Sequence, residues 1–122
     1  MAGFASLIWL DFECPDPVAL AEFYRQALGW DVLDSQDDYA VLSTGALRVR
    51  LGRVEGYQGP GWPDAAGPKR YHLDLHVADV SDAVERCLKL GAQKPGFQPG
   101  GDQWTVLTDP AGHPFCVTAH HG

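Results

Sequence analysis

The chain has 122 residues, a net charge of −7 and 45% hydrophobic content, which suits one globular domain or two small halves that share a core. Its lysines and arginines are dispersed, which argues against nucleic acid or an anionic membrane as the main partner. No stretch is long enough to cross a membrane, and the N-terminus lacks the basic start of a signal peptide, so we expect a cytoplasmic location. Three cysteines without CxxC spacing indicate neither a disulfide framework nor a structural zinc site.

The first predicted element is a strand over Leu7–Cys14, where apolar and polar residues alternate. This strand places Trp9, Asp11 and Glu13 on one face and apolar side chains on the other. An Asp-Pro pair then predicts the start of a helix over Val18–Leu28, which a glycine ends. The apolar stripe of this helix should cover the apolar face of the strand.

Three short strands are predicted next, and turn residues separate them: Trp30–Asp34, Tyr39–Ser43 and Leu47–Val54. In the last of these strands, Arg48 and Arg50 lie on the face opposite the apolar residues. Both arginines face a ligand cup if the apolar side meets the helix. The alternative is an outer surface that water covers.

The Gly- and Pro-rich segment 55–69 reads as a loop that joins two halves of the chain. Tyr57 and Trp62 lie in this loop, where two large aromatic side chains indicate that something is covered. One reading is a lid over a ligand. The other is packing against the flank of the domain itself.

The second half repeats the first at a constant offset, since Asp74 follows Asp11 by the same 63 positions that separate Asp79 from Asp16 (74 − 11 = 79 − 16 = 63). A strand over Tyr71–Asp79 would place His72, Asp74 and His76 on one face. That face is either solvated or the floor of a ligand cup.

A helix over Val80–Leu90 follows, and then three more strands complete the repeat: Ala92–Lys94, Gln103–Thr108 and Pro114–Ala119. Alternation in the last strand turns Cys116 and Thr118 toward the same cup.

Three motifs stand out in the sequence: DP-x-x-LA-x-FY-x-x-x-LG at Asp16–Gly29, HLDL-x-V-x-D at His72–Asp79 and DP-x-GHPFC at Asp109–Cys116. Together they resemble the vicinal oxygen chelate superfamily, which includes glyoxalase I, bleomycin-resistance proteins, fosfomycin-resistance enzymes and extradiol dioxygenases. The likeness runs from about Leu7 to Thr118, and the Trp62-Pro63 loop is similar to that of a glyoxalase-like subgroup common in actinobacteria.

The resemblance implies an α+β fold in which tandem βαβββ modules form a cup-shaped, partly open mixed β-sheet barrel. It implies a single domain over residues 1–122, with modules at 5–54 and 70–119 and a linking loop at 55–69. It also implies a homodimer, because members of the superfamily pair modules within one chain or between two chains. A dimeric partner module without chemistry of its own is one reading of such a domain.

Enzymes of the superfamily take metal ligands, usually His, Glu or Gln, from the first and last strands of each module. By resemblance these positions fall on Trp9, His72 and Cys116, while the strand Leu47–Val54 offers no ligand. His72 is then the only ligand-type residue of the usual set, so no cofactor is predicted. A divalent metal at a displaced site, where His72 joins Asp11, Asp74 or His76, is the alternative.

The leading functional hypothesis is therefore a metal-independent cup that binds or sequesters a planar or aromatic small molecule. Trp9, Trp104 and the Tyr57/Trp62 loop would provide its walls. Its polar or thiol lining would comprise Asp11, Arg48, Arg50, Asp74, His76 and Cys116. The alternative is a lyase, isomerase or dioxygenase of the glyoxalase type, in which His72 is a metal ligand or a general base.

Overall fold

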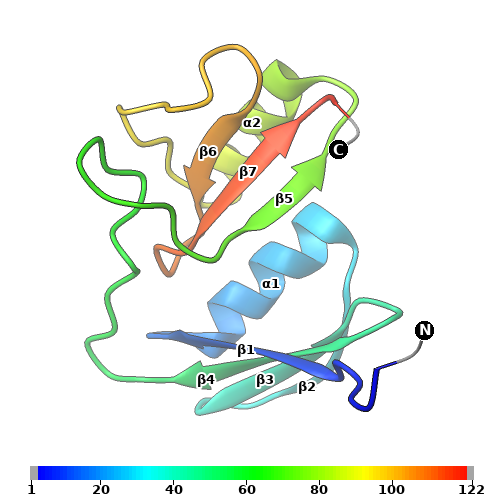
Figure 1. Cartoon of the computed structure of the whole chain (residues 1–122). Coiled ribbons are helices and arrows are strands. Elements are labelled where there is room, and N and C mark those ends of the chain that lie inside the picture. Colours follow the sequence, from blue (N-terminus) through cyan, green and yellow to red (C-terminus); the bar gives the residue numbers. More distant parts are fainter. Residues whose placement is uncertain (1–2, 121–122) are drawn as a thin grey trace. The chain divides into compact units, whose positions relative to one another are not determined.

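The computed structural model describes residues 3–120 and divides into two compact units, one ending at Tyr57 and the other starting at Gln58. Each unit contains one helix and one sheet (Figure 1). The first unit holds β1 (Trp9–Cys14), α1 (Pro17–Leu28), β2 (Asp31–Ser35), β3 (Tyr39–Ser43) and β4 (Arg48–Arg53). The second holds β5 (Leu73–His76), α2 (Val80–Lys89), β6 (Thr105–Thr108) and β7 (Pro114–Thr118). Within the described residues, neither helix is long and apolar enough to span a membrane.

The sheet of the first unit has the order β1-β4-β3-β2, in which β1 runs parallel to β4 and the other pairs are antiparallel. Residues of β4 alternate between the two faces, so Val49 and Leu51 are fully buried while Arg48 and Arg50 are exposed. Contacts from α1 to β2, β3 and β4 close the apolar face. The arginines therefore lie on the face of the sheet that α1 does not cover, here called the open face, as the alternation predicts.

Capping fixes both ends of α1. The carboxylate of Asp16 accepts a hydrogen bond from the backbone N–H of Ala19 at 3.1 Å. Gly29 ends the helix at φ 70°, a left-handed conformation that favours glycine. These are the residues at which the sequence predicts the helix to begin and end.

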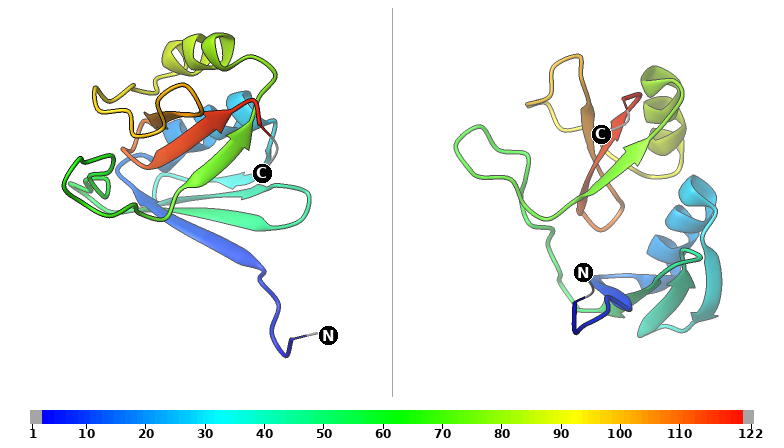
Figure 2. Two further views of the ribbon diagram at one scale, coloured as in Figure 1. Left: turned by 45° about the horizontal axis from the view of Figure 1, so that its top comes forward. Right: turned by 45° about the vertical axis from the view of Figure 1, so that its right-hand side comes forward.

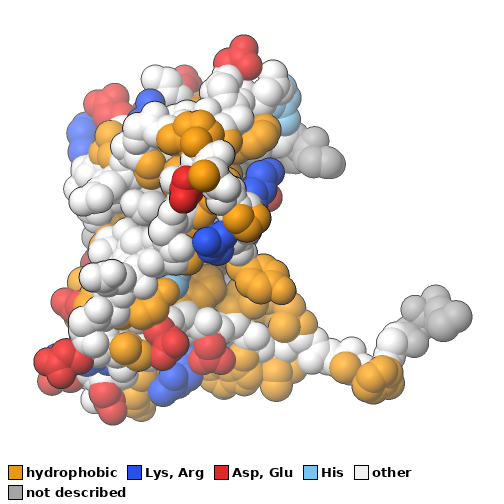
Figure 3. Space-filling view, turned by 60° about the vertical axis from the view of Figure 1, so that its left-hand side comes forward, with side chains coloured by type: hydrophobic (Ala, Val, Ile, Leu, Met, Phe, Trp, Pro, Cys, Tyr) orange, Lys and Arg blue, Asp and Glu red, His pale blue; other side chains and the backbone are white. Residues whose placement is uncertain are grey.

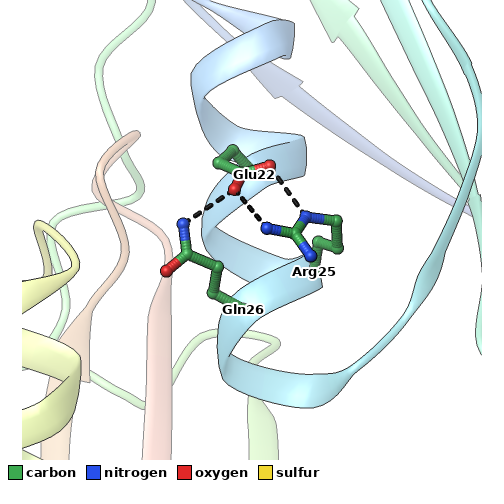
Figure 4. Close-up of polar contacts among 3 residues, drawn as sticks. All are labelled: Glu22, Arg25 and Gln26. Atoms are coloured by element: carbon green, nitrogen blue, oxygen red, sulfur yellow. Dashed lines mark hydrogen bonds and ion pairs between the residues drawn. The ribbon is translucent and has the colours of Figure 1, made fainter.

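The exposed side of α1 carries a small polar network (Figure 4). Arg25 and Gln26 both donate hydrogen bonds to the carboxylate of Glu22, at 2.6 to 2.9 Å. These hydrogen bonds, with Arg25 first, lower the pKa of Glu22 to about 2. The network is open to water, so it adds little to the stability of the helix.

The sheet of the second unit has the order β5-β7-β6, with β5 parallel to β7 and β6 antiparallel to β7. The helix α2 packs against β6 and β7 and covers one face of this sheet (Figure 2). Asp79 caps α2 by accepting a hydrogen bond from the backbone N–H of Asp82 at 3.1 Å. The predicted α+β class is thus confirmed, and over residues 3–120 neither sheet closes into a barrel.

The second unit departs from the predicted strands at two places. The strand expected over Tyr71–Asp79 is shorter, and His72 lies one residue before β5 begins. The strand expected over Ala92–Lys94 is reduced to a single bridge between Gln93 and Thr108. A side chain occupies part of the edge of β6 instead.

This side chain belongs to Gln98, whose amide pairs with the backbone of Val106 as a neighbouring strand would. Its Oε1 accepts a hydrogen bond from the N–H of Val106 at 2.8 Å, and its Nε2 donates one to the carbonyl of Val106 at 2.9 Å. The edge of β6 is therefore satisfied locally without another strand. Pro95, which has no backbone N–H to donate, lies directly after the bridged segment.

Candidate functional site

The second unit contains a cavity of about 480 Å³ that lies along β5 and β7. Its lining combines a tryptophan, a lysine, three histidines, a carboxylate, a thiol and smaller groups. These residues are Lys69, His72, Asp74, Leu75, His76, Gln103, Trp104, Cys116, Thr118 and His120. The size and the mixture of apolar and polar groups are typical of a small-molecule site.

Contacts on three sides hold the imidazole of His72. Trp62 stacks on it with ring centroids 5.0 Å apart and 25° between the ring planes. Its Nδ1 lies 2.7 Å from the carbonyl oxygen of Arg70, and its Nε2 lies 3.2 Å from Oδ1 of Asp74. Both ring nitrogens thus face oxygen acceptors, an arrangement that suits either an imidazolium or a neutral ring with a cation between Nε2 and Asp74.

Cys116 lies opposite Asp74 in the parallel register of β5 and β7. Its side chain is buried in a small core with Trp62 and Val106. Burial, followed by the charge of Asp74 and a hydrogen bond to it, raises the pKa of the Cys116 thiol to about 12, although the charge of Lys69 acts in the opposite direction. In this state the thiol is protonated near neutral pH and is a poor nucleophile.

His72, Asp74 and Cys116 together offer one imidazole nitrogen, one carboxylate oxygen and one sulfur atom within 4.8 Å of one another. This donor set suits a zinc-like ion, and three protein ligands leave a coordination position open. If Nδ1 of His72 donates to the carbonyl of Arg70, Nε2 keeps its lone pair for a metal, as the outer shell of metal sites commonly arranges. The residues therefore fit a divalent metal, provided that the Cys116 thiol loses its proton on binding.

Trp104 and Lys69 form the aromatic side of the cavity. The ammonium of Lys69 lies 5.1 Å from the centroid of the Trp104 indole. The indole also packs closely on Gly100, where an added Cβ would clash with three carbons of the ring. This contact requires a residue that has no side chain.

Four of the predicted site residues lie instead on the open face of the first unit. Arg48 stacks over Trp9, with Cζ 5.7 Å from the ring centroid. Arg50 lies 3.9 Å from the carboxylate of Asp11 and 5.8 Å from the centroid of Tyr39. These residues form a cluster of their own that is part of the first unit.

The two aromatic residues of the predicted loop are separated. Tyr57 is half-buried at the end of the first unit, whereas Trp62 is buried in the second unit against His72. Trp62 thus packs against its own domain, which is the second of the two predictions made for this loop. Neither residue lines the cavity.

The structure thus brings five predicted residues to one cavity and adds others that the sequence did not identify. The five are His72, Asp74, His76, Trp104 and Cys116. Strand alternation also predicts Thr118 there. Gln103 is the first residue of a predicted strand, but it lies in the turn before β6. Lys69 and His120 carry no signal in the sequence, because they lie outside the strands and no periodicity orients their side chains.

Comparison with known proteins shows that the fold is that of glyoxalase and bleomycin-resistance proteins. The chain belongs to the glyoxalase-like domain family, whose model matches residues 8–118. The predicted resemblance to the vicinal oxygen chelate superfamily is therefore confirmed. No curated protein sequence matches the chain significantly.

Three solved structures illustrate the likeness. A possible glyoxalase from Bacillus cereus aligns with a TM-score of 0.66 and 17% identity, covering 93% of this chain and 97% of the other. The fosfomycin resistance protein FosX from Mesorhizobium loti gives 0.65 and 16%, with 99% and 94% covered. The bleomycin-binding protein from Streptomyces verticillus, complexed with copper(II)-bleomycin, gives 0.57 and 18%, with 99% and 100% covered. At these identities the likeness establishes the fold.

The raised thiol pKa gives a test of the cluster's electrostatics. In metal-free protein, we expect the ultraviolet absorbance of the Cys116 thiolate, taken as the difference between wild type and Cys116→Ala, to appear near pH 12. Asp74→Asn should lower this pKa, because it removes a negative charge from beside the thiol. Because the pKa of the Cys116 thiol is raised in the folded state, this group's contribution to the free energy of unfolding is fully present below its unfolded-state pKa. The contribution is lost as pH rises through the folded-state pKa.

A wild-type thiol that titrates near the ordinary value of 9.0 would contradict this account of the cluster. An unchanged titration in Asp74→Asn would show that the carboxylate does not act on Cys116. Asp11→Asn, which alters the matching position of the repeat in the first unit, is the control and should leave the titration unchanged.

Proposed function

We propose that the protein binds, and in doing so sequesters, a small planar or aromatic molecule in the cavity of the second unit, without needing a metal. The observation that carries this proposal is the cavity of about 480 Å³ with an indole as one of its sides and several polar groups converging on it. Pockets of about 300 to 1,000 Å³ with aromatic walls and few polar groups are the usual sites for small ligands. Sequestration requires no catalytic residue.

The comparisons support this proposal at the level of the family. One solved structure of the same fold is a bleomycin-binding protein in complex with its drug, so the scaffold supports binding of a small molecule. In this chain the flat indole of Trp104 is the surface on which a planar ligand would stack. The polar groups around it would fix the ligand's orientation.

Substitution of Trp104 tests the proposal. We expect planar aromatic probes, beginning with 2-naphthamide, to raise the melting temperature of the wild-type protein, because they bind the folded state. Trp104→Ala should weaken their binding by at least tenfold, since losing a central aromatic anchor typically costs about 2 kcal/mol or more. Titration calorimetry would measure the affinity.

Trp30→Phe is the control, because Trp30 stacks on Tyr24 in the first unit and is not among the residues that line the cavity. This variant should bind the probes as the wild type does. Equal affinity of Trp104→Ala and the wild type would contradict the proposed site.

A second candidate function is a glyoxalase-type lyase, isomerase or dioxygenase, and the observation that favours it is the cluster of His72, Asp74 and Cys116. A divalent metal bound there would supply Lewis-acid chemistry or an activated water. The chain's own part would be to orient His72 through Arg70 and Trp62. In a metal-free form, His72 would be the general base or acid, with Asp74 beside it.

Metal binding by untagged, chelator-washed protein tests this candidate. If it is correct, added zinc should bind at one ion per chain, and elemental analysis after gel filtration should detect it. His72→Ala and Asp74→Ala should each abolish binding, because two remaining ligands hold zinc weakly. Asp11→Ala is the control and should retain the ion. A wild-type protein that binds no zinc would exclude the metal form.

We also propose that the protein forms a homodimer through the segment that leads into β1. Phe4, Leu7 and Ile8 are exposed, and hydrophobic side chains follow this segment in Figure 3. Within its own sheet β1 is an edge strand, so its outer backbone groups are available to a second copy. Apolar side chains beside an open strand edge favour such self-association.

Sedimentation equilibrium at micromolar concentration tests the homodimer. We expect a dimer for the wild type and a monomer for Ile8→Lys, because a charge in the contact opposes association. Leu33→Lys is the control, since it places the same charge on an exposed apolar residue of β2. A wild-type monomer would contradict the proposal.

For location, we propose the cytoplasm. The three cysteines are free and buried, which is usual in a reducing compartment. The expected partners are a small molecule and a second copy of the chain. The net charge of −7 opposes binding to nucleic acid or an anionic membrane.

A further inference from the structure

Lys69 is the charged group of the cavity that has no counter-ion. Among the described residues it forms no salt bridge, and its ammonium lies over the indole of Trp104 at 5.1 Å from the centroid. Its positive charge extends into the cavity, since it acts on the buried thiol of Cys116. The side chain is exposed, so it is able to swing away from the indole.

The cavity's carboxylate, by contrast, already has partners. Asp74 lies 3.2 Å from Nε2 of His72 and accepts a hydrogen bond from the thiol of Cys116. A cationic ligand would therefore compete with His72 for this carboxylate and would also meet the ammonium of Lys69. An anionic ligand would meet an uncompensated positive charge.

The indole beneath Lys69 is fixed in place. Gly100 packs against one side of the ring so closely that any side chain at this position would collide with it. Trp104 also packs on the core formed by Trp62, Val106 and Cys116. A flat ligand that enters the cavity thus meets a rigid aromatic surface with a movable cation above it.

We propose that the cavity selects planar aromatic anions, which enter between Lys69 and Trp104. The ring of the ligand stacks on the indole, and its carboxylate or equivalent acid group pairs with the ammonium of Lys69. This inference rests on the proposed small-molecule function and adds to it the charge of the ligand. It needs no metal and no bond-forming step.

A pair of probes that differ only in charge tests the proposal. 2-Naphthoate and 2-naphthamide have the same ring and nearly the same shape, but only the first is anionic at neutral pH. We expect the wild-type protein to bind naphthoate about tenfold more tightly than naphthamide, as a charge-assisted contact provides. This preference should shrink as salt concentration rises.

Substitutions then separate the two contacts. Lys69→Met keeps an apolar stem and removes the charge, so we expect the preference for naphthoate to be lost and the two probes to bind this variant equally. Lys69→Arg should restore the preference for naphthoate. Lys89→Met, which removes a lysine that pairs with Glu85 on α2, is the control and should behave as the wild type does.

The outcomes distinguish this inference from the function on which it rests. Equal binding of both probes to the wild type, or a preference for naphthoate that persists in Lys69→Met, would overturn the anion selectivity and leave the planar-ligand site standing. Failure of both probes to bind at ~1 mM, where the corresponding affinity is only about −4 kcal/mol, would overturn the planar-ligand site itself.

Discussion

The parallel pairing of β5 with β7 is the constraint on which the candidate site depends. Its register places Asp74 directly opposite Cys116, so a carboxylate and a thiol become neighbours on one face of the sheet. His72 reaches the same carboxylate from the residue that precedes β5. A slip of one residue would turn Asp74 to the other face and separate these three groups.

The first unit contains the same kind of parallel strand pair, with different side chains. There β1 runs parallel to β4, and Asp11 lies opposite Arg50 as Asp74 lies opposite Cys116. The carboxylate of Asp11 pairs with the exposed guanidinium of Arg50, whereas the carboxylate of Asp74 lies beside a buried thiol and an imidazole. The internal repeat therefore supplies one geometry twice, and the residue types decide which copy resembles a binding or metal site.

Within the second unit, the two candidate functions use adjoining groups. A metal would occupy the space between His72, Asp74 and Cys116, whereas a planar ligand would lie on Trp104 beneath Lys69. The two groups of residues line the same cavity. In this protein, the proposed ligand site and the candidate metal site are therefore neighbours.

Periodicity and capping in the sequence determined the α+β class, the repeat, both helices and most strands, because these depend on contacts between near neighbours. Alternation also identified the face that carries His72, Asp74 and Cys116. Only the tertiary structure decided that Gln98 replaces the expected edge strand and that Lys69 lies over Trp104. These contacts involve residues outside regular strands, where no repeating period fixes the direction of a side chain, and packing between distant segments determines them.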